Sequence, residues 1–412
     1  MIELGLSRIG RLLRRTSLPW RAVHVAGTNG KGSICAHVSA MLHAAGIPSG
    51  RFTSPHLIDR WDCVTLDEET VHESVFHEAE AAVKRRDRED GIGASEFEIL
   101  TATAFEIFND AKVHVAVVEV GMGGRLDATN IIRDPLVTVI SKVGLDHQGF
   151  LGNTIEEIAR QKAGIMKAGV LCIVDASNDS AVRDILLDHA KQVGAGPVVW
   201  SPNDASADIW QVLPKDRYQE HERVNLACAV DAAKTVFKVS PGSIDFTDVL
   251  LAAEPVRWPG RLQVASLSGV SDRKEDVLID GAHNVQSADV LASYVNGKVR
   301  RPGLAVTWLV AMSNGKDLAG LMSRLFATGD KLIAVEFGPV DGMPWVRPAK
   351  TADLLAEAAS VPGLSLGHAE DAGSDVRHGI ERAVTVSGHG PLVIAGSLYL
   401  VSDVLRLVRD GA

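Results

Sequence analysis

The sequence is poor in cysteine, which argues against two kinds of stabilising site. Only four cysteines occur in 412 residues, and no two of them form a CxxC pair. A disulfide framework or a zinc knuckle needs closely spaced, paired cysteines, so neither is indicated. A reducing compartment suits such a chain, and we expect the protein in the cytoplasm. The four residues are Cys35, Cys63, Cys172 and Cys228.

Long apolar runs and an excess of positive charge are also missing. No apolar run approaches the roughly 18 residues that a membrane-spanning helix requires. The formal net charge is -10 without long blocks of one sign, whereas a nucleic-acid-binding protein presents a basic face to the phosphates. We therefore expect neither a membrane nor a nucleic-acid partner. Any anionic substrate must be held by local positive groups.

The first 20 residues, MIELGLSRIGRLLRRTSLPW, are basic and amphipathic. They carry four arginines and the amino terminus against one acid. This pattern also occurs in mitochondrial presequences, but no cleavage signal follows, so we favour a surface helix that belongs to the fold. A mitochondrial share of the protein is the alternative.

Apolar, strand-like runs alternate with helix-like segments. Examples of the strand-like runs are residues 22–27, 113–121 and 136–144. Nearly continuous apolar strands interleaved with helices are typical of a parallel sheet built from βαβ units. A chain of this length also exceeds what one hydrophobic core usually supports.

A domain boundary is indicated where the periodicity breaks. Pro255 and the Pro259-Gly260 pair interrupt the pattern, and a new series of strands and helices begins at residues 276–283,. We predict an α/β protein with two domains. Residues 1–256 form a P-loop mononucleotide-binding domain with a parallel sheet, and residues 257–412 form a smaller, Rossmann-like α/β domain.

The stretch HVAGTNGKGS, residues 24–33, lies between a strand-like and a helix-like run and contains three glycines. A strand, a glycine turn and a helix start bring backbone N–H groups and the positive end of the helix dipole to one point, which makes a phosphate site. Lys31 would reach the terminal phosphates. The hydroxyl of Ser33 or Thr28 would meet phosphate or magnesium.

This loop is a variant of the general Walker pattern. Val25 stands in place of its first glycine, and Gly32 stands where Ser or Thr should follow the lysine,. Its placement between strand and helix still favours nucleotide binding over an ordinary glycine turn. The residues predicted to bind ATP in this loop are Gly27, Thr28, Asn29, Gly30, Lys31, Gly32 and Ser33.

A series of motifs from about Leu6 to about Leu407 resembles one known family. The chain is similar to the dihydrofolate synthase and folylpolyglutamate synthase family of the Mur-ligase superfamily. The stretches SPHLIDRWDC and SEFEILT resemble fungal dihydrofolate synthases most. The motifs that carry the resemblance are GTNGKGS, FTSPHL, EVGMGGRLDATN, GLDH, QKAGIMK, WPGRL, DGAHN and GSLYLV.

The resemblance implies an ATP-dependent acid–amino-acid ligase. In this family the γ-phosphate of ATP is transferred to a carboxylic acid, and the amine of L-glutamate attacks the acyl phosphate. Phosphoryl transfer leaves the protein two tasks, positioning and charge neutralisation. The implied cofactors are ATP and Mg²⁺, residues 1–256 would bind ATP, and residues 257–412 would ligate glutamate. The implied partners are a pterin acid, L-glutamate and ATP, and we expect a monomer.

Three residues are Mg²⁺ ligands by resemblance: Ser54, Glu119 and His147. Glu119 ends an apolar run, and ligands collect at the carboxyl ends of parallel strands,. Oxygen ligands suit this hard ion, whereas a histidine does not follow from its preferences, so His147 depends on the resemblance. The alternative is a capping carboxylate and an ordinary loop histidine.

Lys162 lies in a helix-like segment, and the matching lysine of similar proteins is carbamylated. Burial would favour the neutral amine that carbon dioxide needs. The alternative is a solvated surface lysine. With Lys31 and His283, Lys162 completes the predicted catalytic set.

The resemblance assigns further contacts in the second half. Asp280 would lie on the ribose side of the nucleotide, His283 between phosphate and the incoming glutamate, and Arg261 near the phosphates. Helix capping is the alternative for Asp280, because aspartate caps helices well. Asn225 would contact adenine and Ser397 the glutamate. The motif DGAHN closes a strand and opens a helix.

Phe97 matches a position that stacks on a pterin ring. An aromatic face suits a flat heterocycle, although a phenylalanine beside a helix is also a common core residue. The sequence departs from the family after SPHL, where IDRWDCVTLDEET replaces a charged pair and an Asn-Gly turn. Glu222 also replaces a glutamine beside Asn225.

Four functions remain open at this point. The first is a ligase that adds glutamate to dihydropteroate. The second is a folylpolyglutamate synthase, and the third is a related ligase for a non-pterin acid, for which the altered loop is the only hint. The fourth is a nucleotide-dependent switch, which would not need the motifs DGAHN and GSLYLV.

Overall fold

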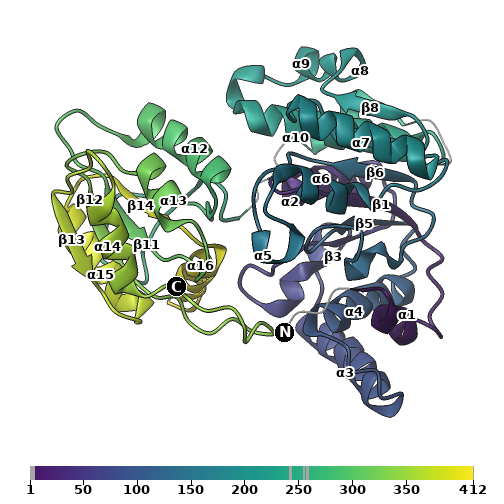
Figure 1. The fold of residues 1–412 in the computed structure, drawn as a ribbon, viewed down its shortest axis with the longest axis horizontal. Coiled ribbons are helices and arrows are strands. Elements are labelled where there is room, and N and C mark those ends of the chain that lie inside the picture. Colours follow the sequence, from purple (N-terminus) through teal and green to yellow (C-terminus); the bar gives the residue numbers. More distant parts are fainter. Residues whose placement is uncertain (1–4, 241–243, 254–255, 257–258, 412) are drawn as a thin grey trace. The chain divides into compact units, whose positions relative to one another are not determined.

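The computed structural model divides into two compact units (Figure 1). The first comprises Met1–His56 and Trp61–Arg257, and the second comprises Leu57–Arg60 and Trp258–Ala412. A four-residue segment of the N-terminal half thus belongs to the C-terminal unit. The assignment of ATP binding to residues 1–256 and of glutamate ligation to residues 257–412 stays a prediction. The structure describes residues 5–240, 244–253, 256 and 259–411.

An eight-stranded sheet forms the centre of the first unit, with the order β4-β3-β2-β5-β1-β6-β7-β8. The six strands β2, β5, β1, β6, β7 and β8 pair in parallel, and β3 and β4 add an antiparallel edge. The strands are β1 Arg21–Ala26, β2 Ser49–Phe52, β3 Val64–Leu66, β4 Glu69–Thr70, β5 Val115–Glu119, β6 Val137–Ile140, β7 Cys172–Asp175 and β8 Val198–Ser201.

Successive side chains of β1 enter different cores, because side chains alternate along a strand. Val23 and Val25 pack with the helices α2 and α10, whereas Ala22 packs with α1 and α4. The helices are α1 Ser7–Leu12, α2 Lys31–Ala44, α3 Glu73–Glu89, α4 Glu96–Asp110, α5 Gln148–Leu151, α6 Ile155–Ala163, α7 Ser180–Val193, α8 Asp204–Ala207, α9 Ile209–Val212, α10 Glu220–Phe237 and α11 Phe246–Ala252, with the 3₁₀ helices η1 Arg60–Cys63, η2 Ala128–Ile131 and η3 Lys215–Arg217.

Several of these helices begin at capping boxes, among them α4 and α6. The Ser95 hydroxyl accepts the Glu98 N–H, and the Glu98 carboxylate accepts the Ser95 N–H, so two N–H groups at the start of α4 are satisfied,. Thr154 and Glu157 do the same at the start of α6. The first box fixes the turn that carries Phe97.

Within the basic N-terminal segment, Ser7–Leu12 form the short helix α1, so a helix is present where one was predicted. Ile9 and Leu12 are fully buried. Arg8 pairs with Glu98 at 2.9 Å, and Arg11 donates to the Asp90 carbonyl at 2.7 Å. The Arg86 guanidinium donates to the Leu12 carbonyl at 2.8 Å. The arginines therefore attach α1 to α3 and α4.

The second unit has a six-stranded sheet with the order β13-β12-β11-β14-β10-β9, parallel except for β9. The prediction of an α/β protein with a parallel-sheet unit and a smaller α/β unit is confirmed. The strands are β9 Gln263–Ala265, β10 Val277–Ile279, β11 Thr307–Val310, β12 Lys331–Ala334, β13 His368–Asp371 and β14 Leu392–Ala395. The helices are α12 Val285–Tyr294, α13 Leu318–Leu325, α14 Thr351–Ser360, α15 Val376–Ser387 and α16 Leu398–Asp410, with a π-helical turn at Val295–Val299.

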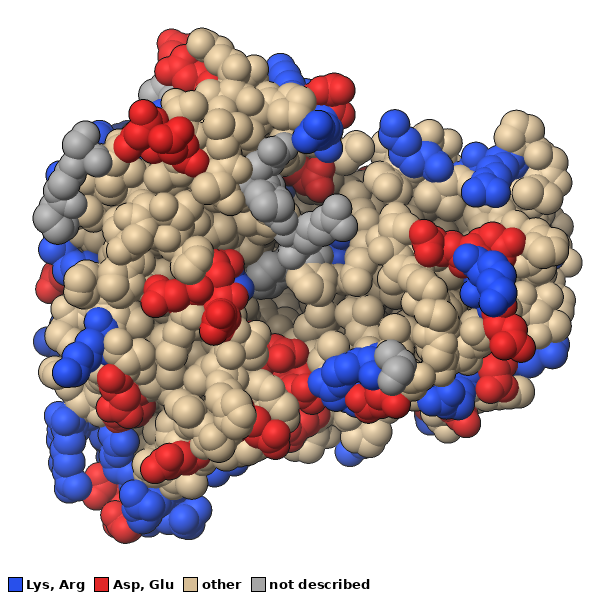
Figure 2. All heavy atoms as spheres, turned by 180° about the vertical axis from the view of Figure 1, so that it is seen from behind, with Lys and Arg blue, Asp and Glu red and all other residues tan. Residues whose placement is uncertain are grey.

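Three properties of the described residues bear on the expectations about compartment and partners. All four cysteines are buried. Among the described helices, none is long and apolar enough to cross a membrane. On the face in Figure 2, basic side chains lie in small groups with acidic ones between them.

Candidate active site

The glycine loop connects β1 to α2 and is hydrogen-bonded to the loop that follows β6. The backbone N–H groups of Thr28 and Asn29 donate to the Lys142 carbonyl at 2.8 and 3.2 Å. The Thr28 hydroxyl donates to the Gly144 carbonyl and accepts its N–H, and the Ser141 hydroxyl donates to the Asn29 carbonyl at 2.7 Å. The Thr28 hydroxyl thus supports the loop, which leaves Ser33 as the better candidate for phosphate or magnesium.

Two glycines of this loop adopt conformations that other residues avoid. Gly27 has φ 152° and Gly30 has φ 91°. A Cβ atom at Gly27 would overlap the Ser141 hydroxyl, and one at Gly30 would overlap the Asn225 side chain. Asn225 of α10 therefore lies directly on the loop, and its contact with adenine stays a prediction.

The start of α2 has the character of an anion site. The Ile34 N–H donates to the Gly30 carbonyl and makes the first bond of the helix. By helix geometry, the N–H groups of Lys31, Gly32 and Ser33 have no acceptor within the helix. Together with the helix dipole they would attract phosphate oxygens.

Lys31, Glu119 and Ser54 come together at the carboxyl edge of the sheet. Lys31 Nζ lies 3.6 Å from Glu119 Oε1 and donates to the Thr28 carbonyl at 3.2 Å. Glu119 Oε2 accepts the Ser54 N–H at 3.3 Å. The Glu119 side chain is only 7% exposed, and a buried carboxylate needs positive partners nearby.

The residues present fit Mg²⁺ in their chemistry. Within the part of the chain that the structure describes, no group of three or more His, Cys, Asp and Glu side chains could hold a metal ion. The predicted set instead offers one carboxylate, one hydroxyl and one imidazole. Mg²⁺ commonly takes one or two carboxylates and fills its other positions with water and substrate phosphates, so Glu119 and Ser54 suit it.

His147 lies in the loop after β6 as the residue that precedes α5. Its backbone is left-handed, with φ 52° and ψ 36°, a conformation that costs a residue other than glycine about 1–2 kcal/mol. Its Nε2 lies 3.8 Å from Asp146 Oδ2. Asp146 also interacts electrostatically with Lys162, so this loop lies near the buried lysine.

Lys162 is buried, which excludes the alternative of a solvated surface lysine. The residue is 3% exposed, and its Nζ donates to the Gly27 carbonyl at 2.7 Å. Burial, with the charge of Lys31, lowers the pKa of Lys162 to about 7. A large fraction of the amine is therefore neutral near neutral pH, the form that carbamylation requires. The carbamate itself stays a prediction.

The motif GMGGRLDATN positions the end of α6 that carries Lys162, a role that sequence reasoning missed. The Asn130 amide donates to the Gly164 and Arg125 carbonyls, each at 3.0 Å, and accepts Lys167 Nζ at 2.7 Å. The Arg125 N–H donates to the Gln161 carbonyl at 2.8 Å. These contacts connect two motifs that are far apart in the sequence.

A buried chain of hydrogen bonds connects β1 to the same motif. The Thr129 hydroxyl donates to Asp127 at 2.6 Å and accepts from His24 Nε2 at 2.9 Å. Burial lowers the pKa of His24 to about 3 and raises that of Asp127. Asp127 also accepts the Met122 N–H at 2.9 Å, which fixes the glycine turn after β5. The signal in the sequence was the Asp-x-Thr pattern, which is typical of an N-cap.

Phe97 lies against the same turn. A Cβ atom at Gly121, two residues after Glu119, would overlap the Phe97 ring. The ring centroid lies 6.2 Å from that of Phe52, two residues before Ser54. Phe97 is partly exposed, so the ring belongs to the wall of the Glu119 region as well as to the core.

The four residues predicted in the second unit lie at one edge of its sheet. Asp280 follows β10, and Ser397 follows β14, its parallel neighbour. The Asp280 carboxylate accepts the N–H groups of Leu262 at 2.7 Å and Ala282 at 2.8 Å. The Arg261 guanidinium occupies the space above Gly281. Asp280 thus fixes the main chain on both sides of this edge.

His283 and Ser397 are also locally anchored. His283 Nδ1 donates to the Gly281 carbonyl at 2.8 Å, which makes Nε2 the acceptor nitrogen of a neutral ring. The Ser397 hydroxyl accepts the Tyr399 N–H at 3.1 Å and caps α16. The predicted residues therefore form two sets, one in each unit.

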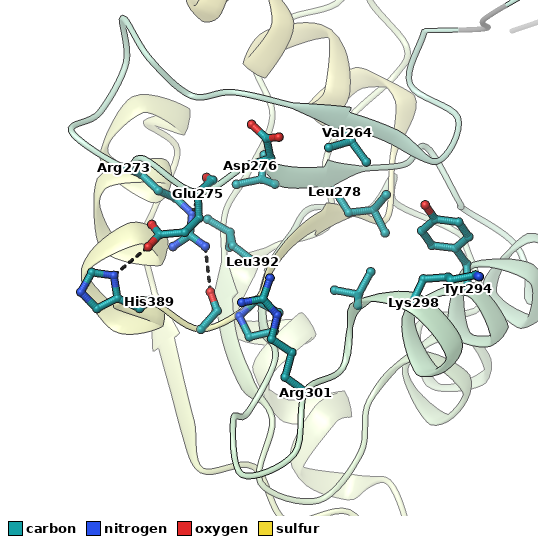
Figure 3. Close-up of a pocket in the computed structure, with 14 residues that line it drawn as sticks. Val264, Arg273, Glu275, Asp276, Leu278, Tyr294, Lys298, Arg301, His389 and Leu392 are labelled. Carbon is teal, nitrogen blue, oxygen red and sulfur yellow. Dashed lines mark hydrogen bonds and ion pairs between the residues drawn. The ribbon is translucent and has the colours of Figure 1, made fainter.

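A pocket of about 200 Å³ lies at the opposite ends of the strands β10 and β14 (Figure 3). It includes Arg273, Lys298 and Arg301, and none of the predicted site residues lines it. Arg273 donates to the carbonyls of Gly388 and Gly390 at 2.8 and 2.7 Å. This arginine therefore stabilises the turn before β14.

Comparisons with known proteins cover both units of the chain. Residues 25–240 match the Mur ligase middle domain, and residues 263–407 match the C-terminal domain of dihydrofolate synthetase. The chain is 37% identical to a probable dihydrofolate synthetase of Schizosaccharomyces pombe, with 99% of each chain covered. The chain belongs to the dihydrofolate synthase and folylpolyglutamate synthase family.

Two further members of this family are similar over nearly their full lengths. Dihydrofolate synthetase of Saccharomyces cerevisiae is 32% identical, with 98% of each chain covered. The structure of a bifunctional folylpolyglutamate synthase/dihydrofolate synthase of Yersinia pestis, complexed with AMPPNP and a Mn ion, is 27% identical with a TM-score of 0.80. That comparison covers 99% of this chain and 94% of the other.

The departure from the family's Asn-Gly turn leaves the turn itself in place. Asp67 and Glu68 both have left-handed backbones, with φ 48° and 70°, as a tight hairpin turn requires. Asp67 accepts the Ser49 N–H at 2.8 Å. Glu68 pairs with the buried Arg51 at 2.8 Å and accepts the Ser39 hydroxyl. These contacts offset the cost of the left-handed backbone at Asp67 and Glu68, a cost that would be smaller for Asn-Gly.

The second departure from the family, Glu222, is a helix cap. Its carboxylate accepts the Gln219 N–H at 2.7 Å within the capping box of α10. A negative charge is favourable at a helix N-terminus. The Glu222 carboxylate, three positions before Asn225, is therefore hydrogen-bonded within the helix cap.

Proposed function

We propose that this protein is an ATP-dependent ligase that joins L-glutamate to the carboxylate of 7,8-dihydropteroate and so forms dihydrofolate. The observation that carries this proposal is the convergence of Lys31, Glu119 and Ser54 beside the glycine loop, in a chain that is similar over its full length to fungal dihydrofolate synthetases. The small number of cysteines and the lack of a CxxC pair in the sequence support a cytoplasmic location,. We further propose that it acts as a monomer.

The first unit would activate the acid. The glycine loop from Gly27 to Ser33 would hold the phosphates of ATP, with Lys31 neutralising the terminal charge and Asn225 beside adenine. Glu119, Ser54 and His147 would hold Mg²⁺, which supplies charge neutralisation for phosphoryl transfer. Phe97 would stack on the pterin ring, so that the carboxylate points toward the γ-phosphate. Lys162 would act as a carbamate.

The second unit would supply the amine. Arg261 would neutralise phosphate charge, and Asp280 would lie on the ribose side. His283, with Nε2 as its acceptor nitrogen, would lie between the acyl phosphate and the amine of glutamate, where it could take up a proton as the amide forms. Ser397 would contact the glutamate. These residues would also have to exclude water from the acyl phosphate, because water would hydrolyse this intermediate before glutamate attacks it.

A substrate panel tests the proposal. Purified protein is incubated with ATP, Mg²⁺ and L-glutamate, together with dihydropteroate, tetrahydrofolate or a non-pterin aromatic acid, and glutamate-dependent ADP release and product mass are measured. We expect turnover with dihydropteroate. Turnover with tetrahydrofolate alone would identify a folylpolyglutamate synthase instead, and turnover with the non-pterin acid alone would identify the third alternative.

The variant Lys31→Ala separates a ligase from a nucleotide-dependent switch. We expect this variant to lose glutamate-dependent ADP release, because it lacks the positive charge of Lys31 that would neutralise the terminal phosphates. Its circular dichroism spectrum should be unchanged. Persistent turnover in this variant would contradict the assigned phosphate site. ADP release by the unmodified protein that does not depend on the acid or on glutamate would indicate a switch.

A further inference from the structure

The segment Leu57–Arg60 belongs to the C-terminal unit although it follows the Ser54 loop of the first unit. Its main chain is held by α16. The Arg406 guanidinium donates to the Ile58 carbonyl at 2.6 Å, and Arg409 forms an ion pair with Asp59. A hydrogen bond from a charged group to a main-chain carbonyl is one of the stronger contacts in proteins.

Arg406 is itself held in place. It donates to Asp403 Oδ1 at 2.9 Å, and Asp403 Oδ2 accepts the Gly338 N–H at 2.7 Å. Asp403 therefore orients the Arg406 guanidinium toward Ile58, and the Gly338 N–H holds the Asp403 carboxylate in place.

Arg60 provides a second anchor. The residue is only 6% exposed. Its guanidinium fills the space above Gly342, where a Cβ atom would overlap Nη1. Gly342 has φ 67°, so both its backbone and its missing side chain are suited to this contact.

Leu57 places the start of the segment beside predicted site residues. It packs against the apolar cluster that contains Val401 and Val404 of α16. A Cβ atom at Gly260 would lie 3.5 Å from Leu57 Cδ1 and 3.7 Å from Leu398 Cδ2. Gly260 and Leu398 are the neighbours of Arg261 and Ser397 in the sequence.

Ser54 lies only three residues before Leu57. Because a chain spans at most about 3.3–3.6 Å per residue, the Cα atom of Ser54 stays within about 11 Å of that of Leu57. The Ser54 N–H also bonds to Glu119 in the first unit. Ser54 is thus hydrogen-bonded to the first unit and lies only three residues along the chain from the segment that belongs to the C-terminal unit.

We propose that Leu57–Arg60 is a tether that sets the position of the Ser54 loop from the C-terminal unit, with Arg60 and Arg406 as positioning residues for the acid substrate. The identity of that substrate rests on the proposed function; the docking of the tether does not. The Ser54 loop begins two residues after Phe52, whose ring lies 6.2 Å from that of Phe97, the predicted pterin contact. This loop would then respond to the unit that carries Arg261 and Ser397.

A pair of glycine variants tests the docking. Gly342→Ala would displace the Arg60 side chain, whereas Gly363→Ala is a matched control. Gly363 has a similar left-handed φ of 77°, but no atom lies within 4 Å of its Cβ position. Trypsin cleavage after Arg60 is measured by mass spectrometry. We expect a rise in cleavage rate of about tenfold or more in Gly342→Ala alone, since proteolysis follows the population of the open form.

Steady-state kinetics of the same variants tests the positioning role. We expect Gly342→Ala to raise the KM for the acid about tenfold or more, because small misplacements near a reacting group are costly. The change in the KM for ATP should be smaller, because the glycine loop would hold most of the phosphate contacts. Arg406→Lys, which keeps a charge beside Asp403 but loses the planar fork, should shift the same constant in the same direction.

Each outcome decides the proposal. Equal cleavage rates in both glycine variants would refute the docking. Faster cleavage with an unchanged KM for the acid would refute the positioning role. If the unmodified protein were inactive with dihydropteroate, the proposed substrate would be wrong, but the cleavage assay would still support or refute the tether.

Discussion

At the hairpin turn Asp67-Glu68, backbone strain lowers the stability of the fold and the ion pair between Glu68 and Arg51 raises it. The relative size of these two effects predicts that restoring a glycine at the turn destabilises the protein. Replacing Glu68 by glycine restores the family's turn chemistry and relieves a left-handed backbone, which is worth about 1 kcal/mol. The same change removes the partner of Arg51, whose side chain is only 10% exposed. Breaking a buried pair costs about 3–5 kcal/mol, and we take the low end because the Glu68 side chain is 26% exposed.

The loss of the ion pair should therefore exceed the relief of strain by about 2 kcal/mol. For a unit of this size, Glu68→Gly should lower the Tm by about 4–8 °C, measured by differential scanning calorimetry. Lys112→Gly is a control for strain alone, because Lys112 is exposed and has a left-handed φ of 53°. That variant should raise the Tm slightly.

Two outcomes would refute this reasoning. If Glu68→Gly raised the Tm as Lys112→Gly does, the ion pair would contribute less than the strain. If the double variant Arg51→Met/Glu68→Gly were no more stable than Glu68→Gly, the cost would not come from an unpaired Arg51. We expect the double variant to recover much of the lost stability, since a well-packed apolar side chain replaces a buried pair at little cost.

Two further predictions concern the candidate site. Burial lowers the pKa of Lys162 to about 7, from 10.5, so the folded state holds fewer protons than the unfolded state between these values, and this lysine should make stability rise with pH across that window. In Lys162→Met, compared with the unmodified protein in buffer free of carbon dioxide so that Lys162 is a free amine, that contribution should disappear, as measured by Tm values at both ends of the window. An unchanged pH dependence would mean that the amine stays charged. Phe97→Ala should raise the KM for the pterin acid by about tenfold, because stacking on an aromatic ring is worth about 1–3 kcal/mol. An unchanged KM would favour a non-pterin acid.

Features encoded by local sequence were predictable. The glycine loop between a strand and a helix follows from the residues of HVAGTNGKGS alone, and the alternation of apolar strands with helices predicted the α/β class. The position of Glu119 at the end of a strand followed from the same logic. These features depend on neighbours within a few positions in the chain.

Features that depend on distant partners were not predictable. The burial of Lys162 rests on its contact with the Gly27 carbonyl, 135 residues away. The loss of Asn-Gly looked like the loss of a turn, because the sequence did not show that Arg51 and Ser49 would hold Asp67 and Glu68. Nothing in the sequence indicated that Leu57–Arg60 would belong to the C-terminal unit.

The membership of Leu57–Arg60 in the C-terminal unit has a practical consequence. The polypeptide passes from one unit to the other three times, so no single cut separates them. A fragment starting near Pro259 would lack Leu57 and leave apolar surface of α16 uncovered, and Arg406 would lose the Ile58 carbonyl. Such a fragment should be prone to aggregation, and a peptide spanning the missing four residues should improve its solubility.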